Sequence, residues 1–63
     1  MPAMEINNYY SPDQIESDGL IEKDIKDIHA SIYIKGNKVY FFESIDKDNL
    51  RLYSIINKRS FFL

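Results

Sequence analysis

The sequence predicts an α+β fold, a small domain in which one short amphipathic helix packs on a three- to four-stranded antiparallel meander sheet. Two runs of β-branched and aromatic residues flank the pair Gly36-Asn37, and a third run follows a polar turn. Ahead of these runs, isoleucines recur at the spacing of a helix. The 63 residues suit one domain, so we expect residues 1–63 to fold as a single unit.

The first segment predicts a short strand followed by a helix start. Met4 to Tyr10 is typical of an edge strand, although Asn7-Asn8 weakens the pattern. Ser11-Pro12-Asp13-Gln14 then favours a helix N-terminus, because a serine N-cap, a proline at the first helical position and a glutamine at the third satisfy free backbone donors. Gly19 is expected to end or interrupt this short turn.

The main helix is expected over residues 19–29. Four isoleucines from Ile21 to Ile32 follow spacings of 4, 3 and 4, which places them on one stripe while the charged residues between them face water. We expect the helix to give way to a strand near Ala30, so that Ile32 belongs to the sheet.

Two turns define the predicted sheet. A two-residue Gly36-Asn37 loop suits a primed hairpin turn, and residues 46–49 predict a second, polar turn. The expected register pairs are Ile34 with Val39, Tyr33 with Tyr40, Ile32 with Phe41, Tyr40 with Ile55, Phe42 with Tyr53, Glu43 with Leu52 and Ile45 with Leu50.

Alternation along these strands gives the predicted sheet two different faces. The aliphatic face, expected to pack on the helix, holds Ile32, Ile34, Val39, Phe41, Ile45, Leu50, Leu52 and Ile56. The other face carries aromatic and basic side chains, among them Tyr33, Tyr40, Phe42, Arg51 and Tyr53. A domain of this size buries only about 60% of its unfolded surface, so the second face is expected to lack cover.

These five residues of the second face are predicted to bind a partner, because Tyr, Phe and Arg are favoured anchors of protein interfaces. As an alternative, the N-terminal segment or residues 60–63 fold over the face and hide it. The terminal Phe61-Phe62-Leu63 is expected to form a fourth strand or to cross to a partner subunit. A homodimer would resolve both the small core and the apolar second face.

The charges predict a second candidate surface. The net charge is −2, but residues 1–31 carry about −5 and residues 32–63 about +3. A possible acidic mimic surface, in which carboxylates stand in for phosphates, consists of Asp13, Glu16, Asp24 and Asp27. The alternative is that these acids are only the solvated side of a helix.

Catalytic and cofactor chemistry finds no support in the sequence. Cysteine is absent and His29 is the only histidine, which argues against a zinc site or a catalytic triad. No glycine-rich phosphate loop is present. No apolar run approaches the roughly 20 residues that cross a bilayer. We therefore expect no enzyme activity, cofactor, metal or membrane partner, and a cytoplasmic location.

The sequence thus predicts a small non-enzymatic protein-binding module that inhibits or regulates a larger macromolecule. Isoleucine far outnumbers valine, and asparagine, lysine and tyrosine are frequent, a bias that suggests a phage, a mobile element or a low-GC bacterium. The alternative function is a single-stranded nucleic-acid-binding protein that stacks bases on the aromatic and basic face. The negative net charge makes nucleic acid the less favoured partner.

Overall fold

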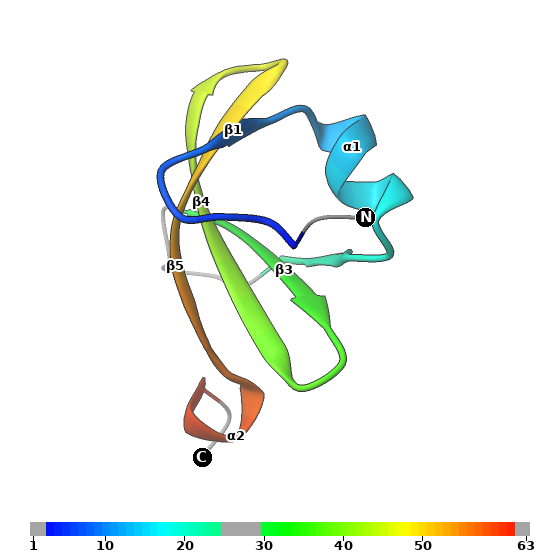
Figure 1. Ribbon diagram of the computed structural model, residues 1–63, viewed down its shortest axis with the longest axis vertical. Coiled ribbons are helices and arrows are strands. Elements are labelled where there is room, and N and C mark those ends of the chain that lie inside the picture. Colours follow the sequence, from blue (N-terminus) through cyan, green and yellow to red (C-terminus); the bar gives the residue numbers. More distant parts are fainter. Residues whose placement is uncertain (1–2, 25–29, 62–63) are drawn as a thin grey trace.

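The computed structural model describes residues 3–24 and 30–61, which form a five-stranded antiparallel sheet with two short helices (Figure 1). The elements are β1 (Tyr9–Tyr10), α1 (Pro12–Ser17), β2 (Ile21–Lys23), β3 (Ser31–Lys35), β4 (Lys38–Asp46), β5 (Asn49–Asn57) and α2 (Lys58–Phe61). The strand order is β1-β5-β4-β3-β2. The predicted meander is confirmed as β3-β4-β5, but two edge strands extend it, so the domain is mostly β and only loosely α+β.

The helix start at Ser11 is confirmed. The Gln14 backbone N–H donates to Ser11 Oγ at 3.1 Å, and the Ser11 N–H donates to Gln14 Oε1 at 2.9 Å. This reciprocal capping box anchors α1 and directs Ile15 into the core, where it is fully buried. This short helix, capped at Ser11, therefore supplies cover for the sheet.

The prediction of a helix over residues 19–29 is wrong for the part of this range that the structure describes. Gly19 has a positive φ of 90°, and its N–H donates to the Glu16 carbonyl at 3.0 Å, so α1 stops there. Residues Ile21–Lys23 instead form β2, which pairs antiparallel with β3, and Ile21 is 68% exposed. Ile25 and Ile28 lie outside the described residues.

The N-terminal edge strand is shorter than expected. Only Tyr9–Tyr10 is assigned as β1, which pairs with Arg51 and Leu50 of β5. The Asn7 N–H also donates to the Leu52 carbonyl at 2.6 Å, but Asn7 has a φ of 77°. This left-handed residue turns the chain, so the segment before it leaves the sheet.

The hairpin between β3 and β4 has the predicted register. Ile34 pairs with Val39 and Tyr33 with Tyr40, and Gly36 takes the positive φ, 58°, that a primed turn requires. The register between β4 and β5 was predicted only in part. Tyr40 does pair with Ile55, but irregularities between Phe41/Phe42 and between Ser44/Asp46 shift the pairs that lie between these two points. The shifted pairs are Phe42 with Leu52, Glu43 with Arg51 and Ser44 with Leu50, whereas Phe41 with Ser54 and Asp46 with Asn49 keep the register that Tyr40 with Ile55 sets.

Within residues 3–24 and 30–61, the core consists of two clusters on opposite faces of the sheet. The larger lies between the sheet and α1 and contains Ile15, Leu20, Tyr33, Phe42, Leu50 and Leu52. The smaller contains Ile32, Ile34 and Val39, with Phe41, Ile56 and Phe61 packed against it. Phe61 belongs to α2, and its ring contacts that of Phe41 at a centroid distance of 5.4 Å. Phe61 therefore lies in a helical turn and not in the predicted fourth strand.

Candidate functional site

Two of the five residues predicted to bind a partner, Tyr33 and Phe42, lie in the larger core cluster, and a third, Tyr40, packs against it. Phe42 is 0% and Tyr33 is 4% exposed, and Tyr40 is partly buried beside them. The rings of Tyr33 and Phe42 meet edge to face, with centroids 5.4 Å apart and planes at 85°. The expectation that this face lacks cover is wrong, because Ile15 of α1 fills the space above it.

Burial also affects the chemistry of Tyr33. Desolvation raises the pKa of its phenol above the ordinary value of 10.0, and the negative charges of Glu22 and Glu16 raise it further. The phenol therefore stays neutral at physiological pH and serves as a core side chain in the structure.

The other two predicted residues, Arg51 and Tyr53, lie on the opposite face. One extra residue on β5, Tyr53, is accommodated between the pairs Phe41 with Ser54 and Phe42 with Leu52. This β-bulge reverses the alternation, so that Leu50 and Leu52 join the larger core cluster on the same face as Ile55. Regular alternation from Ile55 would have directed Arg51 and Tyr53 towards α1.

Arg51 is held in place by three hydrogen bonds. Its Nε and Nη2 donate to Glu43 Oε2 at 3.1 and 2.6 Å, and its Nη1 donates to Asn7 Oδ1 at 2.9 Å. The guanidinium carbon lies 5.9 Å from the ring centroid of Tyr53, within range of a cation–π contact. The turn at Asn7 is thus tied to the middle of β5.

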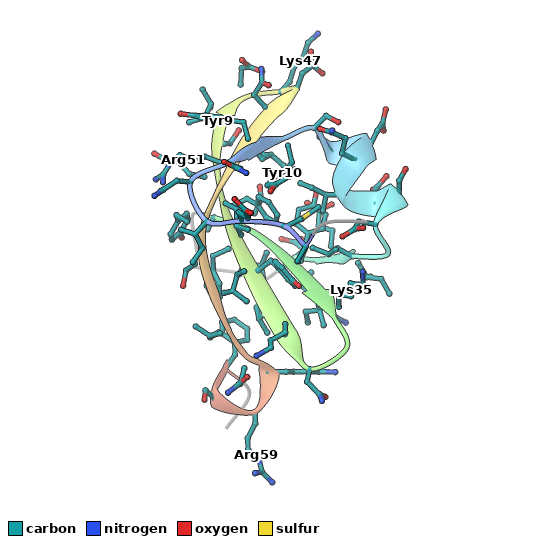
Figure 2. The ribbon with its side chains drawn as sticks, in the orientation of Figure 1. Tyr9, Tyr10, Lys35, Lys47, Arg51 and Arg59 are labelled. Atoms are coloured by element: carbon teal, nitrogen blue, oxygen red, sulfur yellow. The ribbon has the colours of Figure 1, made fainter. Side chains whose placement is uncertain are left out.

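A tyrosine that we did not predict as a site residue completes this region. Tyr9 pairs with Arg51 across β1 and β5 and is 58% exposed, while Tyr53 is 40% exposed. Figure 2 shows Tyr9 and Arg51 projecting from the side of β5 that faces away from α1, whereas Tyr10 points inward. We call the group of Tyr9, Glu43, Arg51 and Tyr53 the Arg51 surface. The pattern of Met4 to Tyr10 as an edge strand could have found Tyr9, since neighbours in a strand face opposite sides.

The Arg51 surface has the composition of a protein contact. Two exposed aromatic rings flank an arginine whose side chain is already ordered, so a partner would meet a preformed shape and little rotamer entropy would be lost on binding. Glu43 compensates the positive charge of Arg51 at 2.6 Å. The surface is therefore amphipathic and nearly neutral.

The four predicted acids do not share one helix. Asp13 and Glu16 are exposed on α1, and Asp24 is exposed just after β2. Asp27 lies outside the described residues. Their role as phosphate mimics stays a prediction.

Other kinds of site find no support in the part of the chain that is described. No group of three or more histidine or acidic side chains there converges to hold a metal ion. Neither α1 nor α2 is long and apolar enough to cross a membrane. Comparisons with protein-family models, with curated proteins and with solved structures give no significant match.

Proposed function

We propose that this chain is a small non-enzymatic protein-binding module that inhibits or regulates a larger macromolecule inside the cell. The observation that carries the proposal is the Arg51 surface, in which the guanidinium is fixed by Glu43 and Asn7 and flanked by the exposed rings of Tyr9 and Tyr53. Tyr and Arg are the residues most often found as energetic anchors of interfaces. Of the five predicted anchors, Arg51 and Tyr53 keep the accessibility that such a role needs.

A capture experiment with matched variants tests this proposal. The immobilised full chain is exposed to a lysate of a low-GC bacterium, and retained proteins are quantified by mass spectrometry. The double variant Tyr9→Ser with Tyr53→Ser should lose a partner that the parent retains, with an affinity at least about tenfold weaker. The control is Ile21→Ser, which removes an exposed apolar side chain from β2 at the far edge of the sheet.

The outcomes separate the two surfaces. A partner retained by the parent and by Ile21→Ser but lost by the double variant supports the Arg51 surface. Retention by the double variant, or loss only with Ile21→Ser, would contradict the proposal. Circular dichroism of each variant shows whether the sheet is intact.

A homodimer is the second form of this proposal. It now rests on Tyr9 and Tyr53, since the rings of Tyr33 and Phe42 have their cover within the chain. Sedimentation at tens of micromolar should give about twice the mass of 7.5 kDa, and the double variant should return it to that of a monomer. A parent that remains monomeric would exclude self-association and leave a different protein as the partner.

Single-stranded nucleic acid remains the alternative, with less support. A stacking platform needs several accessible rings, but two of the five predicted residues lie in the core and a third is partly buried against it. The one arginine of the Arg51 surface is also paired with Glu43. A polarisation titration with single-stranded DNA and RNA at low and moderate salt decides between the two functions. Tight, salt-sensitive binding would favour the alternative.

A further inference from the structure

A cavity of about 550 Å³ lies between the N-terminal segment and α1, on the side of the sheet opposite the Arg51 surface. Its size is within the range of small-molecule pockets, roughly 300 to 1,000 Å³. Residues 3–5, Asn8 and Tyr10 form one wall, and the outer side of α1 forms the other. None of these residues belongs to the Arg51 surface.

The spacing of residues on α1 explains how the helix faces the cavity. Asp13 and Ser17, and likewise Gln14 and Asp18, are four residues apart and therefore lie one above the other on the helix. Ile15 points the opposite way, into the core. The same short helix therefore contributes to the core with one side and lines the cavity with the other.

The cavity has an apolar wall that is fixed in position. Ala3, Met4 and the ring of Tyr10 supply this wall. The Tyr10 ring meets Phe42 edge to face at 6.4 Å, and the Glu5 backbone N–H donates to the Tyr10 hydroxyl at 2.8 Å. Figure 2 shows Tyr10 inside the space between β1 and α1. A ligand would meet a wall that is already ordered.

Carboxylates supply the charge around this apolar wall. Those of Glu5 and Asp13 make no hydrogen bond or ion pair among the described residues, and both groups line the cavity. A third, that of Asp18, lies 3.6 Å from Lys35 Nζ. Residues 3–24 contain six acids and a single lysine, so the potential at the cavity is negative.

We propose that this cavity binds a small aliphatic polyammonium ion, a chain of methylene groups that carries amines at its ends. The methylenes would lie against Met4 and Tyr10, and the ammonium groups would reach the carboxylates of Glu5 and Asp13. A cation can also contact the face of the Tyr10 ring. A bare metal ion fits less well, because the acids line an apolar cavity without converging on one point. An anion would be repelled.

Nuclear magnetic resonance of the full chain tests the proposal, with spermidine as the probe. Spermidine should produce saturating shifts of backbone amide signals, largest at residues that line the cavity, such as Asn8 and Ser17. A neutral diol of similar length and Mg²⁺ at the same ionic strength are run in parallel. The diol tests whether the apolar wall is sufficient for binding, and Mg²⁺ tests whether positive charge is sufficient for binding.

Two charge-matched variants locate the binding. Glu5→Gln with Asp13→Asn removes two carboxylates from the cavity and should weaken spermidine binding about tenfold. Glu16→Gln with Asp24→Asn removes the same charge from exposed positions outside the cavity and should change it less than about twofold. Equal weakening by both pairs, shifts that do not saturate, or the same shifts with Mg²⁺ would each overturn the proposal. The spectra also report whether each variant is folded.

Discussion

The two faces of the sheet differ in how far burial extends across them. Towards α1, buried side chains continue from Leu50 on β5 to Tyr33 on β3, with Phe42 between them. On the opposite face, the buried residues of the described part of the chain are confined to β3 and the start of β4, and the region beyond Phe41 continues into the exposed Arg51 surface. The short capped helix α1, together with Leu20 after it, thus completes one core, and part of the second face stays available for contacts.

The strongest test of this difference compares the adjacent residues Phe42 and Phe41. Phe42→Ala should lower the free energy of unfolding by about 3 to 5 kcal/mol, because the ring is fully buried in the larger cluster. Phe41→Ala should cost less, since Phe41 is only partly buried. Urea denaturation followed by circular dichroism measures both. An equal or larger loss for Phe41→Ala would reverse our assignment of the dominant core.

A smaller effect is expected from the cap of α1. Ser11→Ala removes the acceptor of the Gln14 N–H and should cost about 1 kcal/mol of stability. Ser17→Ala, in the last turn of the same helix, is the control and should cost less, because no hydrogen bond of its side chain is seen among the described residues. Thermal melts of the two variants give the comparison. If the two variants have the same melting temperature, the capping box does not hold α1 against this face of the sheet.

Alkaline pH tests the burial of Tyr33. Its pKa is raised in the folded state by desolvation, so the folded protein holds the phenol proton more tightly than the unfolded chain does. This contribution is fully present below the ordinary pKa of 10.0 and is lost as pH rises through the folded value. Tyr33→Phe should therefore lose stability less steeply above that pH than the parent. Parallel slopes in urea denaturation across that range would mean that Tyr33 is not desolvated.

Local sequence signals correctly predicted the features that depend on neighbouring residues. The capping box at Ser11 needs only a serine, a proline and a glutamine in order, and the hairpin at Gly36 needs only a residue that accepts a positive φ. The faces of β3 and the first half of β4 followed from alternation alone. Each of these features depends on residues that are close together in the sequence, so the sequence alone predicts it.

The rest depended on contacts between distant segments. The isoleucine spacing from Ile21 onward suits a helix, but Ile21–Lys23 gains a strand partner in β3 that local propensity does not reveal. No glycine near Tyr53 indicates the bulge in the sequence. The bulge moved Arg51 and Tyr53 to the opposite face, so the prediction that all five residues share one face was wrong, and their role in binding stays a prediction. The cavity beside α1 depends on where the N-terminal segment lies, and alternation does not predict that.

The smallest expected effect concerns the Arg51 surface itself. In a double-mutant cycle of Glu43→Gln and Arg51→Met, the coupling free energy should be only about 0.2 to 1 kcal/mol, because the side chain of Glu43 is about half exposed and water competes for the ion pair. The coupling should also fall as salt increases. Urea denaturation of the parent, both single variants and the double variant at low and high salt gives the values. A coupling well above this range would place Arg51 among the residues that stabilise the fold. A small coupling means that the fold gains little from the Glu43–Arg51 ion pair, which is the result expected if this pair is kept for the proposed contact with a partner.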